Sequence, residues 1–549
     1  MKKRHTQLSR TLLMSVALSS LCSPHSLADP QTVPDERLNP GFQPENPVIP
    51  PEAVDAERGV TEVAASTPPG AAVPIRGIKF KGADVPGVVA AATEPFLGLP
   101  ANTETLKELA AVMSAAYKKS DVALFTLAIP AQDLSDGVVE VLIAEGQVSD
   151  VITRTDGEVT ERRQLRGYLR PVLAERPASR AGYERAMVLV RRAEGITVKP
   201  GLRTTKEAGA VVLVMDVEEK DNGFAVGYDS RESRLVDSGR FSASGYVYRV
   251  LREGDSLRGR ISFTPDGRQS RSASLQYAVP LGTDGLTFTA AGAYQETRPA
   301  NFPIEGDANF LTAAVSYPVL LNFQQEVSLN ASLDRTESSN TALGSVIANE
   351  NIAAARFGGK ASWITAKWSA ALNLTYAQGL DLGDTVSSVA GADLQFSKIN
   401  GSANLVQVIG EDLHLRLKAS GQWTDDILPA NERLMVGGIE YGRGFTNGLV
   451  SFDKGYVLSF EPAWRPLDEG PFSRSEIYVF ADYADGSVLG SALGEQSFDL
   501  SSAGIGTRIA YKKYATLGLE MAEPLSLPVS GMDDDPIFTV TWALRYRPD

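Results

Sequence analysis

The chain has 549 residues and a formal net charge of −14 at pH 7, which argues against nucleic-acid binding because phosphates require clustered Lys and Arg. Its single cysteine, Cys22, and two of its three histidines lie near the N-terminus, so only His414 follows them and disulfides, thiol catalysis and two-histidine metal sites are excluded beyond that point. The sequence shows no phosphate loop and no G-x-S-x-G elbow, and we expect neither an enzyme activity nor a cofactor.

Residues 1–28 have the pattern of a secretory signal peptide. Four basic residues precede a mostly apolar stretch, Thr11 to Cys22, and Ser26-Leu27-Ala28 offers a cleavage site with small flanking residues. The apolar stretch is too short to cross a bilayer as a helix. We therefore expect the protein to leave the cytoplasm.

Residues 29–73 are predicted to form a linker. Seven prolines fall between Pro30 and Pro51, and proline removes backbone donors while keeping the chain extended. A weakly helical patch, Ala53 to Ala65, follows and is interrupted by Gly59.

Residues 74–147 are predicted to form a small unit of the order β-α-α-β-β. Ile75 to Phe80 alternates as a strand, and a capping box at Thr105 to Glu108 predicts a helix start. Val122 to Ile129 and Val138 to Ile143 are apolar strands. We expect the apolar side chains of this unit to form its core, including Tyr117, Leu124 and Phe125.

A second unit of similar size is predicted over residues 148–220. Its helices are Arg162 to Ala174 and Arg180 to Ala193, and its strands are Ile196 to Leu202 and Ala210 to Val217. Two consecutive α+β units of this kind indicate a structural repeat.

Residues 221–549 alternate apolar and polar side chains in short segments separated by Gly, Asp and Asn. Leu372 and Leu374 share one predicted face, and so do Phe538, Val540 and Trp542. Lipid-facing and lumen-facing residues alternate in this way along transmembrane β-strands. At roughly 20 residues per strand and connection, the region predicts an antiparallel transmembrane β-barrel of about 16 strands. A soluble sandwich or propeller fits less well, because of the secretory signal and the absence of a propeller-like repeat.

The first unit ends in a motif that resembles the end of a POTRA (polypeptide-transport-associated) domain in two-partner secretion (TpsB) transporters, the family that secretes and activates haemolysins. The motif comprises Pro130, Gln132, Asp133, Gly137, Glu145 and Gly146. The resemblance implies two consecutive POTRA domains in the periplasm, followed by an outer-membrane barrel.

Two further motifs in the barrel region resemble the same superfamily. One is similar to the R-G-F/Y tip of a long hairpin loop, here near 428–455, that folds back into the barrel lumen. It comprises Gly437, Gly438, Gly442, Arg443, Gly444, Phe445, Asp453, Gly455 and Glu461. The other is similar to an F-x-D-x-G motif of the barrel wall, with Phe480, Asp482 and, where glycine is usual, Ala484.

The loop motif also has a physical interpretation. Gly442 and Gly444 leave backbone freedom and little bulk around Arg443. An arginine inside a protein-lined lumen needs a planar, bidentate partner, and the resemblance implies Asp482. Alternatively, Arg443 is a solvated charge in an exposed loop. Phe445 either packs the loop tip against the wall or is an interfacial aromatic residue.

The resemblance implies translocation of a large, Sec-exported, TpsA-like exoprotein across the outer membrane. The POTRA domains would capture it unfolded by strand addition to a sheet edge. The implied partners are the exoprotein, outer-membrane lipid and the barrel-assembly machinery, with no metal and no nucleic acid. The family often begins with a helix that plugs the barrel, for which Ala53 to Ala65 is a candidate.

Three other functions compete with this hypothesis. A barrel-assembly insertase shares the loop motif, but insertases usually carry three or more POTRA domains and only two fit before Asn222. A barrel fused to a hydrolase would need a nucleophile elbow, which residues 29–219 lack. A passive porin would not need the periplasmic units.

Overall fold

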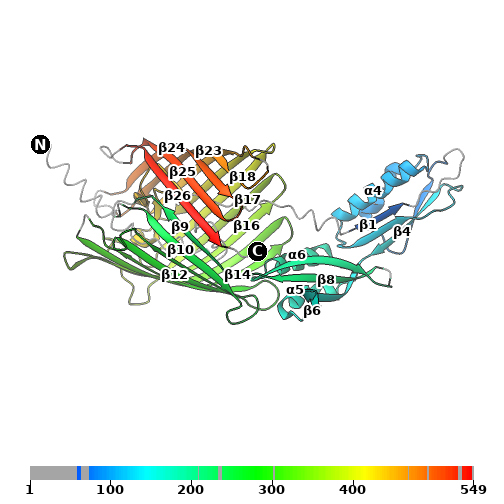
Figure 1. Ribbon diagram of the computed structural model, residues 1–549, viewed down its shortest axis with the longest axis horizontal. Helices are drawn as coiled ribbons and strands as arrows, with labels where there is room; N and C mark the ends of the chain where they lie inside the picture. The colour runs from blue at the N-terminus through cyan, green and yellow to red at the C-terminus, as the bar shows by residue number, and fades with distance from the viewer. Residues whose placement is uncertain are drawn as a thin grey trace.

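A computed structural model of the chain describes residues 59–63, 73–207, 209–232, 236, 238–300, 303–467, 469–490, 494–528 and 534–546. The predicted signal peptide and most of the predicted linker lie outside the described residues. Two small units lie end to end beside a large barrel (Figure 1). Within the described ranges, no helix has the length and apolar character needed to cross a membrane.

The first unit is a four-stranded sheet in the order β1-β3-β4-β2, with helices on one face. Leu109 and Met113 of the long helix are fully buried in its core, where Tyr117 stacks on Phe125 with 4.7 Å between ring centroids. Tyr117 and Phe125 therefore lie in the core of this unit as predicted, whereas Leu124 is buried in the core of the second unit. Its elements are β1 (Gly59–Val63), β2 (Gly77–Lys81), α3 (Gly87–Ala91), η2 (Glu94–Phe96), α4 (Thr103–Lys119), β3 (Phe125–Ile129) and β4 (Val138–Glu145).

Two local predictions were wrong. Helix α4 begins earlier than the capping box at Thr105 to Glu108 suggested, because the Asn102 side chain caps it by accepting a hydrogen bond from the Thr105 N–H at 2.8 Å. The patch Ala53 to Ala65 is not a helix where it is described: residues 59–63 form strand β1, parallel to β3.

The second unit repeats the architecture with the sheet order β6-β5-β8-β7. Its two helices pack on the sheet through buried side chains such as Leu165, Leu169 and Met187. The elements are β5 (Gln147–Thr155), β6 (Glu158–Val159), α5 (Arg163–Ala174), α6 (Arg180–Arg191), β7 (Ile196–Thr204) and β8 (Ala210–Glu219).

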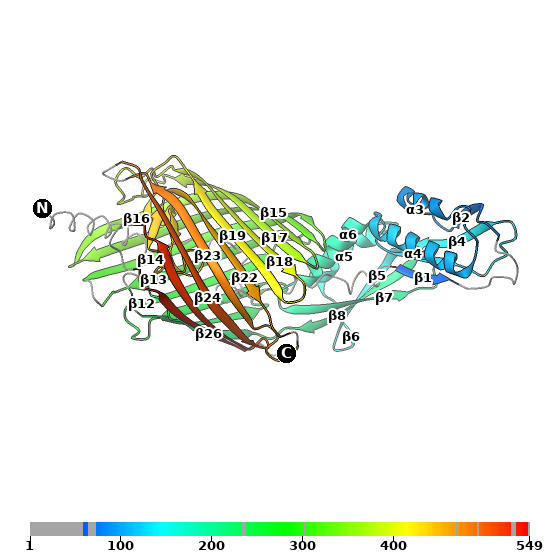
Figure 2. The same ribbon diagram turned by 90° about the horizontal axis from the view of Figure 1, so that it is seen from above.

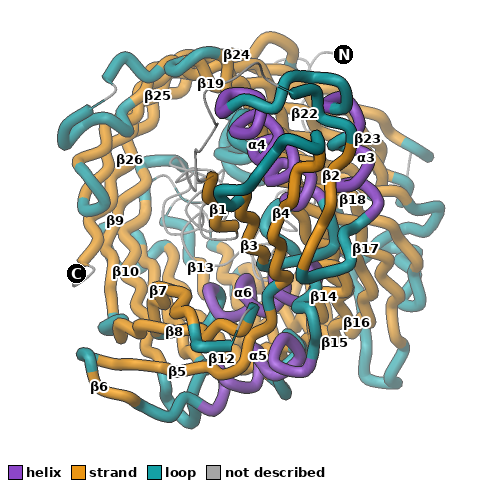
Figure 3. The backbone as a smooth tube through the Cα atoms, turned by 90° about the vertical axis from the view of Figure 1, so that its right-hand side faces the viewer, coloured by secondary structure: helices purple, strands orange, loops and turns teal. Residues whose placement is uncertain are grey.

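In the described part of the chain, sixteen strands close into one antiparallel barrel, with β26 paired to β9. The predicted barrel and its strand number are thus confirmed. Figure 3 shows the barrel as a ring of strands behind the two small units. The strands are β9 (Gly223–Asp229), β10 (Arg240–Tyr248), β11 (Ser256–Phe263), β12 (Ser270–Pro280), β13 (Thr287–Thr297), β14 (Ile304–Leu321), β15 (Gln325–Ala342), β16 (Ser345–Ile364), β17 (Trp368–Leu380), β18 (Ser397–Ile409), β19 (Leu413–Trp423), β22 (Lys454–Trp464), β23 (Glu476–Val488), β24 (Gln496–Tyr511), β25 (Ala515–Ser526) and β26 (Ile537–Tyr546).

The two faces of the barrel wall differ in chemistry. Leu374 and Phe538 on the outer face are 61% and 71% exposed, whereas Asp334 and Arg356 on the inner face are buried. This is the arrangement expected when lipid covers the outside and protein fills part of the lumen. Strands β14, β15 and β16 have 18 to 20 residues, which is longer than the span of about 9–11 residues that a membrane requires.

The second unit is docked onto one end of the barrel (Figure 2), where it contacts the turn after β12, the end of β14 and the start of β15. The guanidinium of Arg185, on α6, donates to the carbonyls of Asp284 at 2.7 Å and Pro318 at 2.8 Å. Arg192 pairs with Glu326 at 2.7 Å. These contacts hold the unit at the end of the barrel where β12 and β14 end and where β13 and β15 begin.

Candidate functional site

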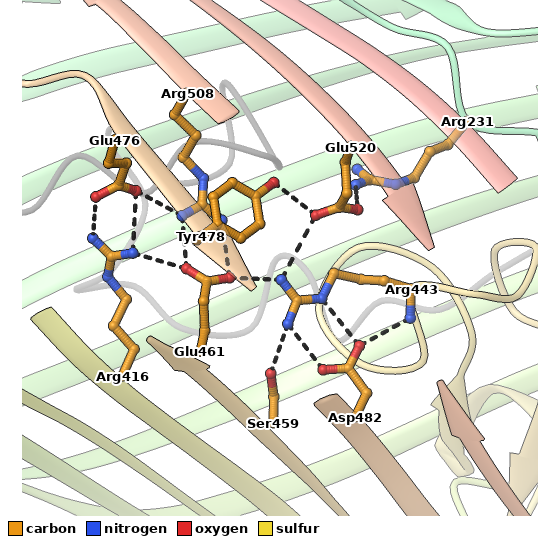
Figure 4. A network of polar contacts seen from close by, with 10 residues as sticks. All are labelled: Arg231, Arg416, Arg443, Ser459, Glu461, Glu476, Tyr478, Asp482, Arg508 and Glu520. Atoms are coloured by element: carbon orange, nitrogen blue, oxygen red, sulfur yellow. Dashed lines mark hydrogen bonds and ion pairs between the residues drawn. The ribbon is translucent and has the colours of Figure 1, made fainter. Parts of the chain in front are cut away.

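A long loop between β19 and β22 folds back into the barrel and positions the predicted tip motif. Its two limbs pair as β20 (Leu434–Val436) and β21 (Val450–Phe452), after a short helical turn, η3 (Ala430–Glu432). The loop tip lies against the inner wall formed by β22 to β25 (Figure 4).

Glycines allow the loop to turn and to approach the wall closely. Gly437 and Gly438 have φ values of 108° and 103°, which side chains other than hydrogen rarely tolerate. A Cβ on Gly444 would lie 2.7 Å from the Cβ of Ser502 on β24. The tip can therefore reach the wall only with glycine at this position.

Arg443 is held by Asp482 of β23 in the bidentate geometry that the sequence suggested. Its Nε and Nη2 donate to the two carboxylate oxygens at 3.0 and 2.9 Å, and its backbone N–H donates to Oδ2 at 3.0 Å. Both side chains are buried. The alternative of a solvated Arg443 in an exposed loop is therefore not observed.

Arg443 has more partners than the resemblance implied. Its Nη1 donates to Glu461 at 2.6 Å and lies 3.7 Å from the Glu520 carboxylate, while Nη2 also donates to the Ser459 hydroxyl at 3.0 Å. The guanidinium lies 3.5 Å from the centroid of the Phe480 ring. This site requires a planar cation that stacks on an aromatic ring and contacts two or more carboxylates at once. Lysine could not fill it, because its ammonium group is not planar.

A second layer of ion pairs continues from Glu461 along the wall. Arg416 of β19 and Arg508 of β24 both contact Glu461, at 2.8 and 2.6 Å, and both contact Glu476 of β23, at 2.6 and 2.7 Å. The Arg508 guanidinium lies 3.7 Å from the centroid of the Tyr478 ring. The stacking seen at the loop tip thus recurs one step along β23.

The charges of this network balance. We define the tip network as the ten residues of Figure 4, in which four arginines face four carboxylates. Arg231, which follows β9, closes it by donating to Glu520 at 2.9 Å, and Tyr478 donates to the same carboxylate at 2.8 Å. Removing one member of a buried ion pair typically costs roughly 3–5 kcal/mol, because the other charge is left uncompensated.

The apolar residues of the loop also pack on the wall. Phe445 is buried in a cluster with Leu449, Phe452 and Leu500, so it packs the tip and is not an interfacial aromatic. The Phe452 ring packs closely on two facing glycines, Gly455 of β22 and Gly486 of β23: a Cβ on Gly486 would lie 2.4 Å from the Phe452 Cγ.

Asp453 lies at the other end of the loop. Its carboxylate accepts hydrogen bonds from the backbone of Leu428 at 2.9 Å, from Arg433 at 3.0 Å and from the backbone of Leu489 at 2.7 Å. It therefore closes the base of the loop and does not contact Arg443.

The motif residues of the first unit do not form one surface. Gln132 pairs with the backbone of Glu140 through two hydrogen bonds of 2.6 and 2.8 Å, and Asp133 accepts from the Ser135 N–H at 2.9 Å, which lowers the pKa of Asp133. Gly137 has a φ of 75°, and a Cβ there would lie 2.7 Å from the carbonyl oxygen of Pro74. Pro130, which precedes Gln132, follows directly after β3. These residues shape the β3–β4 turn.

The end of the motif lies at the elbow between the two units. Gly146 donates to the carbonyl of Leu124 at 2.6 Å, and Leu124 is buried with the core of the second unit. Glu145 accepts from the Tyr117 hydroxyl at 3.3 Å, and burial raises the pKa of both groups. The two units are therefore joined by a packed elbow and not by a free linker.

Replacing Gly146 by alanine is expected to open this elbow. The added Cβ would lie 2.5 Å from the Leu124 Cβ, and overpacking of this kind costs about 1–3 kcal/mol. Limited proteolysis of the purified full chain should then cut between the units faster than in the wild type. Gly87→Ala is the matched control, because a Cβ on Gly87 meets nothing within 4 Å. Equal cleavage of the Gly146 and Gly87 variants would contradict a packed elbow.

Sequence reasoning missed most of the tip network. Arg416, Arg508 and Glu520 lie on β19, β24 and β25, Glu476 begins β23 and Arg231 follows β9, and only the barrel register brings these residues together. Among the described residues, no group of three or more His, Cys, Asp or Glu side chains could hold a metal ion.

Comparison with known proteins now identifies the family. The sequence profile of the family described as "Haemolysin secretion/activation protein ShlB/FhaC/HecB" matches residues 209–509, more than half of the chain. The chain belongs to this family. It is also 19% identical to the "Heme/hemopexin transporter protein HuxB" of Haemophilus influenzae over 460 residues, covering 80% of each protein.

Solved structures support the fold of this family member. CdiB from Escherichia coli matches with a TM-score of 0.68 at 17% identity, covering 88% of this chain and 92% of that one. CdiB from Acinetobacter baumannii matches with a TM-score of 0.60 at 16% identity, covering 99% and 97%. BamA from Haemophilus ducreyi, lacking its POTRA domains 1–3, gives a lower TM-score of 0.52 at 14% identity.

The protein is therefore a two-partner secretion transporter of the outer membrane, with its POTRA domains in the periplasm and a secreted exoprotein as its partner. The family is one of secretion proteins, and the insertase alternative has the more distant structural likeness.

Proposed function

We propose that the POTRA tandem captures one large exoprotein in an unfolded state and passes it to the barrel, whose lumenal loop is latched by Arg443. The observation that carries this proposal is the buried, bidentate pair between Arg443 on the loop and Asp482 on the wall. A loop held in a lumen by a few strong contacts can be fixed in one state and released in another.

The sheet edges of the tandem favour capture by strand addition. In the first unit, β1 pairs with the outer edge of β3 in parallel, from Gly59 opposite Phe125 to Val63 opposite Ile129. An exoprotein segment that binds this edge would displace β1, a strand of five residues. Main-chain hydrogen bonds would supply its affinity with little dependence on sequence.

A disulfide that links β1 to β3 should therefore block secretion. Val60 and Thr126 are register partners, and with Cys22 removed by signal cleavage a Val60→Cys, Thr126→Cys double variant would carry the mature chain's only cysteines. We expect exoprotein in the medium to fall at least tenfold when the disulfide forms and to recover on addition of a reductant. The single variant Thr126→Cys is the control. Unchanged secretion by the fully oxidised chain would exclude this edge as the capture site.

The remaining partners follow from the outer face of the barrel and from its compartment. We propose that outer-membrane lipid covers the apolar outer face and that the barrel-assembly machinery inserts the chain. No ATP is available at the outer membrane, so folding of the exoprotein outside the cell would give transport its direction. The net charge of −14 gives no support for nucleic acid as a partner.

Secretion in a heterologous Gram-negative host tests the proposed function. The host would express the exoprotein encoded beside this chain, with the chain present or absent, and the exoprotein would be assayed in the medium. We expect secretion only when the chain is present. Secretion without the chain, or failure of other barrels to assemble when the native gene is depleted, would favour an insertase.

A further inference from the structure

A second buried charge cluster lies at the base of the lumenal loop, away from the tip network. We define the base cluster as three carboxylates and three cations, which are Asp334, Arg356, Lys398, Glu432, Arg433 and Asp453. Glu432, at the end of η3, is 1% exposed. Its carboxylate contacts Arg356 at 2.7 Å and Lys398 at 2.8 Å.

These contacts attach the loop to a different arc of the wall. Arg356 lies on β16 and also pairs with Asp334 of β15 at 2.6 Å. Lys398 lies on β18 and donates to Gln422 of β19 at 3.1 Å. The tip, in contrast, is held by β22, β23 and β25, so the two ends of the loop are fixed to separate parts of the barrel.

Two successive residues of η3 take part in this attachment, and the next residue pairs within the loop. Asn431 donates to the Ser338 hydroxyl of β15 at 3.1 Å and Glu432 contacts Arg356 and Lys398, whereas Arg433 pairs with Asp453 of the same loop at 3.0 Å. All three are buried. A short helical turn therefore presents polar side chains to several strands at once, which a loop tethered only at its tip would not need.

We propose that Glu432 is a positioning residue for transport: it retains the loop in the lumen independently of Arg443. Its loss would remove the carboxylate that the fully buried Lys398 side chain contacts at 2.8 Å and would take from Arg356 one of its two carboxylate contacts, Asp334 being the other. Removing either anchor frees one end of the loop, and removing both lets it leave the lumen. This inference rests on the proposed function and adds to it that two contacts, Arg443 at the tip and Glu432 at the base, keep the loop in the pore.

Labelling of the loop from outside the cell tests the proposal without the exoprotein. Thr446, next to the tip motif, is half-buried, and Thr446→Cys would give the mature chain one cysteine. Intact cells carrying this reporter would be treated with a bulky, membrane-impermeant maleimide. We would compare the reporter alone with Glu432→Gln, Arg443→Ala and the combination of the two, at equal outer-membrane level.

We expect weak labelling of both single variants and at least tenfold stronger labelling of the combined variant. Glu432→Asp combined with Arg443→Ala should restore protection, because the charge is kept. Glu440→Gln, which alters an exposed carboxylate of the same loop, is the matched control and should not act with Arg443→Ala. Full labelling of Arg443→Ala alone, or no increase in the combined variant, would overturn the proposal. Heat-modifiable migration in electrophoresis would show that each barrel is folded, and because no exoprotein is needed, failure here would leave the proposed function intact.

Discussion

Arg443→Ala is expected to reduce exoprotein in the medium at least tenfold while the barrel stays folded in the outer membrane. The substitution leaves Asp482 buried without its cation, and loss of one member of such a pair typically costs roughly 3–5 kcal/mol. By this estimate, the equilibrium between a latched and a free tip shifts by about 10²–10⁴-fold. A freed tip that is still retained at Glu432 would stay in the lumen and obstruct the exoprotein.

The matched variant Arg443→Lys separates charge from geometry. Lysine keeps the positive charge but cannot reproduce the fork that contacts both oxygens of Asp482, so secretion should be intermediate. The measurement is the ratio of exoprotein in the medium to chain in the outer-membrane fraction. Wild-type secretion by Arg443→Ala would remove the latch from the mechanism.

Glu461→Gln is expected to weaken the barrel itself. Glu461 contacts the arginines of three elements: Arg443 of the loop, Arg416 of β19 and Arg508 of β24. Glutamine keeps the shape but removes the charge that these cations share, and we expect the free energy of unfolding to fall by roughly 3–5 kcal/mol. Urea titration of the detergent-solubilised barrel, followed by heat-modifiable migration, measures this change.

Glu337→Gln is the control for this prediction. Glu337 also pairs with an arginine, Arg335 at 3.0 Å, but its side chain is 50% exposed. Exposed ion pairs contribute about 0–1 kcal/mol, so this variant should unfold close to the wild type. If both variants unfold at the same urea concentration, the network does not stabilise the wall.

The alternating patterns predicted the barrel because the apolar and the polar face of a strand can both be recognised in the residues of that strand alone. Spacing alone predicts that Leu372 and Leu374 share one face of their strand and that Phe538 shares a face with Val540, and these four side chains are exposed on the outer face. The pair of Arg443 and Asp482 was suggested by resemblance, since its members lie 39 positions apart and nothing local connects them.

The rest of the site depends on register, which local sequence does not specify. Arg508 contacts Glu461 because of the register in which β22, β23 and β24 pair. The sequence alone would equally allow many other pairings among the lumenal charges. Glu432 belongs to no motif, and Asp453 is the one residue of the base cluster that the loop motif includes. The prediction that a capping box at Thr105 begins the helix was wrong, because Asn102 caps the helix three residues earlier.

The exact domain limits remain predictions. These are the signal peptide at 1–28, the linker at 29–73, POTRA 1 at 74–147, POTRA 2 at 148–220 and the barrel from 221 onward. Strand β1 extends the first sheet with residues assigned to the linker, and the packed elbow at Gly146 makes the two small units continuous.

Reconstituted transport tests the central claim most directly. Purified chain would be inserted into lipid vesicles, urea-unfolded exoprotein would be added outside, and protease would remove what has not crossed. We predict exoprotein protected inside vesicles that contain the wild-type chain, and at least tenfold less in vesicles with Arg443→Ala. Equal protection in vesicles without the chain, or none with the wild-type chain, would contradict the conclusion that this barrel is the passage.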